Sequence, residues 1–405
     1  MKSMCPMLTL TCISLALASC GIRLPAQNVK SVGSALPAGI IYQTLQTFRE
    51  PDLNMHAYWR VEADGTPTQF PNGLPLEFHT LMIPISQLDF SEDGRRIVFQ
   101  KSEGEDNRQI WLLDTQTGKQ KQLTHDPDRA NGFPHWWSGN PNIVFFMSEP
   151  KKQAFDMFVF GNLGIVNTDG SGYKIYEDIP STLTSPSPDG KTFLYSDFKS
   201  LRIVSLDGQA RTISPTLYPN FNLVASPNCK TNNSFFSVGN WSPDGTFVAL
   251  IPCQGEITFM NLQDSAKTFS LTHNLPGMLT FSSIYAVWSS DSQYFALIGS
   301  TVQTPGPEAS QSHSIIRIFD RTGKLQRQID HPTEWINSLH WRPSTHEFLY
   351  VTEVKDSRDV IPATTVATPL PPPLTKAILV NLDKGATVET KLPKPIRVHA
   401  WLPIP

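Results

Sequence analysis

The fold of this chain is decided by the stretch from Ser86 to Thr124. It begins Ser-Gln-Leu-Asp-Phe-Ser-Glu-Asp-Gly-Arg-Arg-Ile-Val-Phe-Gln-Lys, continues from Asn107 as Asn-Arg-Gln-Ile-Trp-Leu-Leu-Asp-Thr-Gln-Thr-Gly-Lys, and ends in Gln-Lys-Gln-Leu-Thr. Its apolar residues form short runs separated by turn residues, which predicts four strands, at Leu88–Phe90, Ile97–Phe99, Ile110–Leu113 and Lys121–Leu123. Such an antiparallel unit has two apolar faces and must pack between neighbours to bury both.

The turn after the first of these strands recurs along the chain. Asp93 is followed, at intervals of 47 to 55 residues, by Asn140, Asp189, Asp244, Asp291 and Ser344. A period near 50 is the size of one propeller blade, so the sequence predicts an all-β protein, a β-propeller. Asp93, Asp189, Asp244 and Asp291 are expected to accept backbone N–H groups in their turns. A tryptophan at the end of the first strand is expected to wedge between blades, at Trp137, Trp241, Trp288, Trp341 and Trp401.

The two ends of the chain together supply one more blade. Val398–Pro403 matches a first strand that stops at the turn, and the missing second, third and fourth strands match Pro37–Tyr42, Ala57–Val61 and Thr66–Phe70. Closing the ring in this way leaves no unpaired inner edge. We therefore expect seven four-stranded blades in a single domain over residues 37–405, with the C-terminal strand completing the N-terminal blade, and a monomer.

The amino-acid composition and net charge of the chain limit the kinds of function that it could have. The chain has 405 residues, of which 40% are apolar, and a formal net charge of −3 without a Lys/Arg stripe. This balance permits a large core and argues against nucleic acid as a partner.

The N-terminus has the pattern of a secretion signal. Lys2 is followed by an apolar stretch, Met7–Ala18, too short to span a bilayer, and then by Leu-Ala-Ser-Cys ending at Cys20. The last four residues resemble the bacterial lipobox, which implies that residues 1–19 are a lipoprotein signal peptide and that Cys20 carries lipid, followed by a linker to residue 36. An ordinary signal peptide with an incidental cysteine is the alternative. We expect an anchored protein of the bacterial cell envelope, on the periplasmic or the cell-surface side.

Two cysteines remain after the signal and the anchor are set aside, Cys229 and Cys253. An even number in an oxidising compartment suggests one disulfide, and two free buried thiols are the alternative.

The repeats resemble those of TolB-type propellers, the WD40-like repeats shared by TolB and by the propeller domains of prolyl-oligopeptidase-type enzymes. The resemblance rests on Ser-Pro-Asp-Gly turns, on Ile-Trp-Leu-Leu-Asp and on Gln-Leu-Thr, and covers roughly residues 37–404. It is strong at Ser86–Thr124 and Asn240–Leu271, and weaker at Pro134–Asp178. TolB has six blades and a separate N-terminal α/β domain, for which Gly21–Leu36 is too short. The chain is thus expected to be a TolB-like propeller lipoprotein, and the partners of TolB are not carried over.

Catalytic signatures are missing from the sequence. It contains no Gly-x-Ser-x-Gly elbow, no phosphate-binding Gly-x-x-x-x-Gly-Lys-Ser/Thr loop, no Cys-x-x-Cys pair and no His-Glu-x-x-His motif. No catalytic residue, cofactor or metal is therefore predicted. Candidates for a ligand face are histidines near the connections between blades and the residues beside the first of them: His125, Asp126, Asp128, Arg129, His135, His273 and His331. They could equally be polar residues of homologous loops.

The sequence therefore predicts a lipid-anchored, extracytoplasmic propeller that binds or scaffolds without catalysis, with a protein or glycan ligand at one propeller face. The alternative is a propeller-fold carbohydrate-active enzyme, a lyase or hydrolase, with its site at the mouth of the central channel.

Overall fold

The computed structural model describes fifteen segments of the chain, all within one compact unit, residues 32–405. They are residues 36–44, 58–70, 88–102, 107–137, 139–151, 161–180, 184–196, 201–212, 241–250, 256–264, 267–272, 282–302, 312–354, 374–392 and 396–403. Strands and tight turns make up nearly all of these residues. Within these segments we find no helix with the length and apolar character needed to cross a bilayer.

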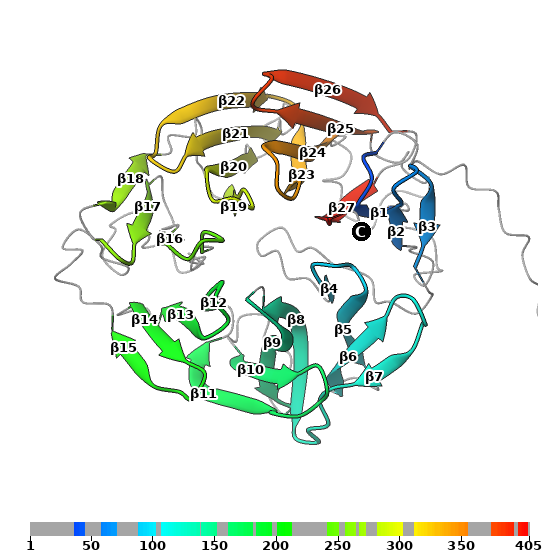
Figure 1. The fold of residues 1–405 in the computed structure, drawn as a ribbon, viewed down its shortest axis with the longest axis vertical. Helices are drawn as coiled ribbons and strands as arrows, with labels where there is room; N and C mark the ends of the chain where they lie inside the picture. Colours follow the sequence, from blue (N-terminus) through cyan, green and yellow to red (C-terminus); the bar gives the residue numbers. More distant parts are fainter. Residues whose placement is uncertain are drawn as a thin grey trace, which may run out of the picture. The chain divides into compact units, whose positions relative to one another are not determined.

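The strands form seven antiparallel sheets, the blades, which follow one another in a ring (Figure 1). Blade 1 contains β27 (Ile396–Trp401), β1 (Ile40–Thr44), β2 (Tyr58–Val61) and β3 (Pro67–Gln69). Blade 2 contains β4 (Leu88–Phe90), β5 (Arg96–Ser102), β6 (Arg108–Asp114) and β7 (Gln120–Gln122). Blade 3 contains β8 (Arg129–Trp137), β9 (Asn140–Pro150), β10 (Asn162–Asn167) and β11 (Lys174–Pro180). Blade 4 contains β12 (Thr184–Pro186), β13 (Thr192–Ser196), β14 (Leu201–Ser205) and β15 (Ala210–Thr212).

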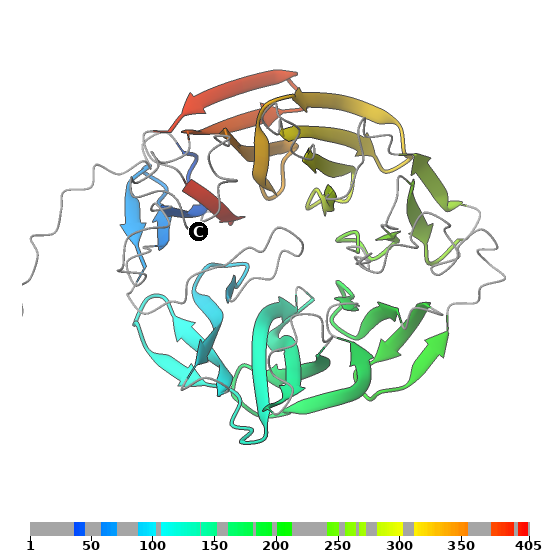
Figure 2. The ribbon, with the colours of Figure 1, turned by 180° about the vertical axis from the view of Figure 1, so that it is seen from behind.

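The remaining blades lie on the other side of the ring, as the view from behind also shows (Figure 2). Blade 5 contains β16 (Phe247–Leu250), β17 (Glu256–Asn261) and β18 (Phe269–Thr272), with Trp241 bridged to Val248 at the place of a first strand. Blade 6 contains β19 (Ser282–Trp288), β20 (Tyr294–Val302), β21 (Ser312–Asp320) and β22 (Leu325–His331). Blade 7 contains β23 (Trp335–Trp341), β24 (Glu347–Val354), β25 (Leu374–Asn381) and β26 (Ala386–Lys391). The topology confirms the prediction of a seven-bladed propeller.

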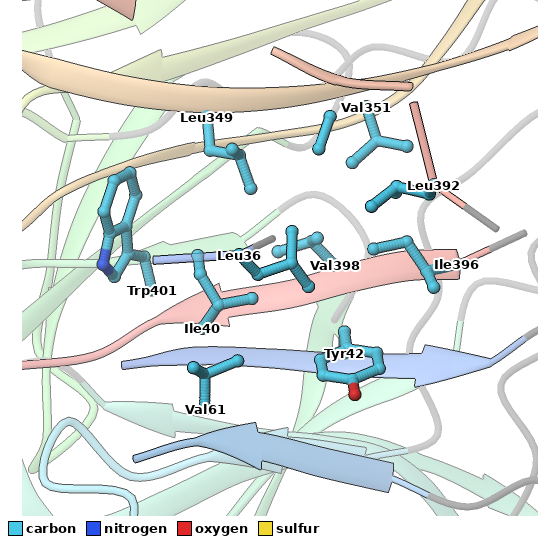
Figure 3. Close-up of a cluster of buried hydrophobic side chains, with 11 residues drawn as sticks. Leu36, Ile40, Tyr42, Val61, Leu349, Val351, Leu392, Ile396, Val398 and Trp401 are labelled. Carbon is cyan, nitrogen blue, oxygen red and sulfur yellow. The ribbon is translucent and has the colours of Figure 1, made fainter. Parts of the chain in front are cut away.

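The ring closes where the sequence predicts it. β27, near the C-terminus, pairs with β1, near the N-terminus. The indole N–H of Trp401 donates to the carbonyl of Ala38 at 3.1 Å, and the amide of Leu402 donates to the carbonyl of Gly39 at 3.0 Å. Side chains of β27 and β1 then pack on Leu349 and Val351 of blade 7 (Figure 3). Closure thus ties both ends of the propeller to each other and to the last blade.

Apolar clusters and tryptophans join the blades. One cluster combines Ile298 of blade 6 with Ile336 and Phe348 of blade 7. The indole N–H of Trp341 donates to the carbonyl of Val287 in the preceding blade at 3.1 Å, and Trp241 donates likewise to Ser185 at 3.0 Å. Both tryptophans therefore bond one blade to the blade before it.

Blade 3 uses two neighbouring tryptophans in opposite directions. Trp136 takes the backward bond, from its indole to the carbonyl of Asp89 in blade 2 at 3.1 Å. Trp137, placed by the repeat pattern at that position, is 1% exposed and donates forward to the carbonyl of Ser187 in blade 4 at 2.8 Å. The cause is a register shift between these two residues, which turns Trp137 to the other face of the strand.

Because successive strands run in opposite directions, their connections lie on two opposite faces of the propeller. The turn face carries the turns between first and second strands and between third and fourth strands. The loop face carries the connections between second and third strands and from each blade to the next.

Candidate functional site

The predicted ligand residues from His125 to Arg129 lie on the loop face, between β7 of blade 2 and β8 of blade 3. His125 and Asp128 are exposed, whereas Asp126 accepts a hydrogen bond from the hydroxyl of Tyr173 at 3.0 Å. Arg129 grips both carboxylate oxygens of Glu177, at 2.7 and 2.6 Å. Tyr173 and Glu177 belong to blade 3. Asp126 and Arg129 therefore fasten the loop to that blade, and their polar groups are largely occupied.

Beneath this loop lies a buried polar layer that the sequence analysis missed. The side-chain amide of Gln109 donates to the carbonyls of Asp126 at 3.0 Å and Arg129 at 3.2 Å. Its oxygen accepts from Thr124 at 2.7 Å and from Asn131 at 3.1 Å. Buried polar groups need such partners, so this network fixes the loop. Gln109 and Asn131 lie within strands, where a lone polar side chain is usually exposed, and nothing in their spacing indicates burial.

The other predicted histidines are placed elsewhere. His135 is on β8, about 20 Å along the strand from Arg129 at the usual rise per residue, and its Nδ1 lies 3.6 Å from a carboxylate oxygen of Asp89. His331 ends β22 in blade 6, where its Nε2 contacts the Tyr350 hydroxyl at 3.0 Å and its Nδ1 lies 3.1 Å from Glu334. The structure thus does not gather His125, His135 and His331.

The described residues contain no metal-binding cluster, and several predicted residues lie outside them. In the segments that the structure describes, no group of three or more His, Cys, Asp or Glu side chains has the arrangement to hold a metal ion. Cys20, Cys229, Cys253 and His273 lie outside the described residues.

On the turn face, four blades share one hydrogen-bonded device, which we call the Ser–Asp clamp. The serine after the first strand donates its hydroxyl to the aspartate two residues on, at 2.5 to 2.7 Å, in Ser91–Asp93, Ser187–Asp189, Ser242–Asp244 and Ser289–Asp291. The same carboxylate oxygen accepts a backbone N–H from the second residue after it. The hydroxyl in turn accepts the N–H that opens the second strand. These residues hold their own turns.

The turn of blade 7 lacks this clamp. Arg342 stands at the serine position and Ser344 at the aspartate position, because Trp341 and Phe348 pair as Trp288 and Phe295 do in blade 6. Arg342 instead forms an ion pair with Glu347, from Nη1 to Oε2 at 2.6 Å. The other oxygen of Glu347 accepts from the side-chain amide of Asn381 at 2.7 Å. The Arg342 hydrogen bond, followed by that from Asn381, lowers the pKa of Glu347. The carboxylate stays ionised at neutral pH.

His346 joins this turn to two carboxylates. Its Nδ1 lies 2.7 Å from Asp383 in the β25–β26 turn, and its Nε2 lies 2.7 Å from Asp291 in the clamp of blade 6. An ionised carboxylate only accepts, so the protonated imidazole, which has a donor on each ring nitrogen, is the form that satisfies both contacts. The hydrogen bond to Asp383, with that to Asp291, raises the pKa of His346 against the opposing effect of burial. Burial acts to raise the pKa of Asp291, but the bonds from Ser289, Gln293 and His346 outweigh it and lower that pKa.

A cavity of about 390 Å³ opens at this place. Its lining consists of polar and charged residues at the two turns of blade 7: Arg342, Ser344, Thr345, His346, Glu347, Asn381 and Asp383. We call this cavity the blade 7 pocket. It lies where the Ser–Asp clamp has been replaced. The Thr345 hydroxyl holds this turn instead, because it donates to the carbonyl of Arg342 at 3.3 Å and accepts the backbone N–H of Glu347 at 3.2 Å. None of its residues was predicted as a site residue, although the loss of Ser-x-Asp-Gly at Arg342–Thr345 was a usable signal.

Comparison with known proteins supports the fold. No protein-family model matches the sequence. The uncharacterized peptidase YuxL of Bacillus subtilis is 26% identical over 122 residues, 28% of this chain. The chain spans only 17% of that curated relative.

Solved structures extend the likeness to the whole propeller. The periplasmic gluconolactonase PpgL of Pseudomonas aeruginosa has a TM-score of 0.50 and 12% identity, covering 90% of this chain and 100% of that one. The WD40 domain of Sif2 gives 0.47 and 13%, over 90% and 88% of the two chains. TolB of Acinetobacter baumannii gives 0.42 and 16%, over 73% and 63%. At such identities the likeness concerns the fold. The chain is a seven-bladed propeller with TolB-like, WD40-like repeats, and its seventh blade carries a polar pocket.

Proposed function

We propose that this chain is a lipid-anchored binding propeller of the bacterial cell envelope, and that it holds its ligand without catalysis at the blade 7 pocket. The observation that carries the proposal is the replacement of the Ser–Asp clamp by a charged and hydroxyl-bearing set around a cavity. Repeated turns conserve their geometry by repeating their residues. The turn of blade 7 changes both the residues and the position of the positive φ, which is at Ser344 instead of one residue later. Side chains on such a turn are available for recognition.

The pocket has the means for binding a polar ligand. Arg342 is a donor with a planar fork, Ser344 offers a hydroxyl, and Asp383, 61% exposed, offers a carboxylate oxygen. Its lining residues lie at turns between paired strands of blade 7. Binding would therefore need little rearrangement of the backbone.

Cross-linking tests the binding site. A photoreactive residue replaces Lys384, an exposed neighbour of Asp383, or Gln263, an exposed turn residue of blade 5, in cells that express the full chain. We expect a discrete adduct with an envelope component from position 384 and none from position 263. Equal labelling from both positions, or none from 384, would contradict the site.

Fractionation tests the anchor. Replacement of Cys20 by serine removes the thiol that accepts the lipid and should move the chain from the membrane to the soluble fraction, because several acyl chains hold a protein firmly and none holds it at all. A matched Cys12→Ser variant alters a cysteine of the signal peptide and should remain membrane-bound. Membrane retention of the Cys20 variant after complete removal of the signal would argue against lipid anchoring.

A further inference from the structure

The charges of the blade 7 pocket are already paired with one another. The guanidinium of Arg342 contacts Glu347 at 2.6 Å, and the imidazole of His346 contacts Asp383 and Asp291 at 2.7 Å each. An ionic ligand would have to displace one member of these pairs, and it would then meet a like charge nearby. Because Arg342 and Asp383 are 41% and 61% exposed, its attraction to either would also be screened by water.

The pocket still has hydrogen-bond donors and acceptors that its own residues do not use. Among the described residues, the side chain of Arg342 donates its hydrogen bond to Glu347 through Nη1. Its other side-chain N–H groups are available as donors. Asp383 uses Oδ1 toward His346 and keeps Oδ2 as an acceptor. Ser344, which bonds to Ser290 through its backbone N–H at 2.8 Å, offers a hydroxyl that both donates and accepts. A matching ligand must therefore present donors and acceptors close together without net charge.

Hydroxyl groups meet this demand better than the alternatives. Each hydroxyl is at once a donor and an acceptor, so a ligand with several neighbouring hydroxyls can bond to an arginine, a serine and a carboxylate in turn. A peptide carries its donors and acceptors on separate groups and brings apolar side chains, whereas every residue that lines this pocket is polar or charged. We propose that the blade 7 pocket binds a neutral, hydroxyl-rich saccharide. This inference rests on the proposed function and names the ligand class of the same pocket.

Calorimetric titration of the purified full-length chain tests the ligand class. The neutral probes are cellotetraose, maltotetraose and chitotetraose, and the anionic probe is tetragalacturonate. We expect at least one neutral tetrasaccharide to bind and tetragalacturonate to bind more weakly than that probe. Asp383→Ala should weaken binding of the neutral probe by about tenfold, the usual effect of one lost hydrogen bond to a charged group.

Two further variants keep the test independent of folding. Ser344→Gly removes the hydroxyl and suits the positive φ of 58° at this residue, so this variant should fold normally and bind several-fold more weakly. Asp207→Ala alters the corresponding position in the third-to-fourth-strand turn of blade 4, away from the pocket, and should bind like the unaltered chain.

Each contrary result has a distinct meaning. Binding of tetragalacturonate alone, binding of no saccharide, or neutral binding that Asp383→Ala and Ser344→Gly leave unchanged would overturn the saccharide inference. The adduct from position 384 decides the proposed function separately. A polypeptide adduct there, together with no saccharide binding, would retain the binding site and replace its ligand class.

Discussion

The first turns of blades 6 and 7 share one backbone hydrogen bond but differ in conformation and in side chains. Blade 6 has its positive φ at Ser292, whereas blade 7 has it one position earlier in the turn, at Ser344. In blade 6 the amide of Ser289 donates to the carbonyl of Tyr294 at 2.9 Å, and in blade 7 the amide of Arg342 donates to Glu347 at 2.8 Å. The side chains of blade 6 form the Ser–Asp clamp. In blade 7, Arg342 pairs with Glu347 within the turn, and His346 reaches Asp383 in the next turn and Asp291 in blade 6. Blade 7 therefore joins its first two strands without the clamp. Its residues can therefore change when a binding site is needed.

The largest expected effect concerns the buried tryptophan that precedes each of the two turns. Trp288 and Trp341 precede them and are 6% and 7% exposed. Trp288→Ala and Trp341→Ala should each lower the free energy of unfolding by about 3–5 kcal/mol, because each leaves a cavity between blades. Denaturant unfolding measures both. If Trp341→Ala were nearly neutral, blade 7 would not be packed as blade 6 is, and the comparison of their turns would lose its basis.

The next effect concerns closure of the ring by the β27–β1 pair, which places blade 1 beside blade 7. Gly39 and Gly65 have φ near +85° and +82°, so alanine is strained at both, by about 1–2 kcal/mol. A Cβ on Gly39 would also lie 2.3 Å from the carbonyl oxygen of Leu402, whereas a Cβ on Gly65 would meet nothing within 4 Å. Gly39→Ala should therefore lower stability by about 1–3 kcal/mol more than Gly65→Ala. Equal losses of unfolding free energy would mean that the β27–β1 contact is looser than described.

Much of this architecture is visible in the sequence, for a physical reason. Each blade must place a turn and an aromatic residue at the same points to pack on its neighbours, so the period, the blade count and the closure by Val398–Pro403 can be read from the residues alone. Trp137 shows the limit, because a register shift between Trp136 and Trp137 exchanges their roles.

Much less of the candidate site than of the fold could be predicted from the sequence. His125 and His331 each occur at or just after the end of an outer strand and His135 near the end of the next inner strand, so strand length and blade order separate the three. His346 occupies a variable position of the repeat, equivalent to Gln293 in blade 6, and its contacts with Asp291 and Asp383 cross between turns. Such contacts depend on how two blades meet, which residue spacing does not encode.

A smaller effect distinguishes the two turns directly. Ser289→Ala removes the clamp of blade 6 and leaves the Asp291 oxygen and the Tyr294 N–H without their partner, which should lower stability by about 1–3 kcal/mol. Ser344→Gly, two positions into the turn of blade 7, should change stability by at most about 1 kcal/mol and in the stabilising direction, because it relieves a positive φ. Thermal melts of the two variants measure the difference. A loss at Ser344 as large as that at Ser289 would show that the turn of blade 7 has a clamp of its own.

The smallest effect is the pH dependence that His346 gives to the boundary of blades 6 and 7. Its pKa is raised in the folded chain relative to about 6.5 unfolded, so its stabilisation is complete below pH 6.5 and is lost as pH rises through the folded pKa. The groups that face it are Asp291, Asp383 and the ring of Tyr294, whose centroid lies 4.8 Å away.

Unfolding midpoints from pH 5.5 to 9 measure this dependence. The unaltered chain should lose stability relative to His346→Gln as pH rises through this range. Parallel pH profiles of the two proteins would contradict the bridging role of His346.

Replacement of the clamp in blade 7 is expected to leave a binding site at that turn. The most direct test restores the clamp with the double variant Arg342→Ser, Ser344→Asp and measures the adduct formed from a photoreactive residue at position 384. We predict a chain that melts within a few degrees of the unaltered one and yields little or no adduct. A folded double variant that forms the adduct in full yield would contradict the claim.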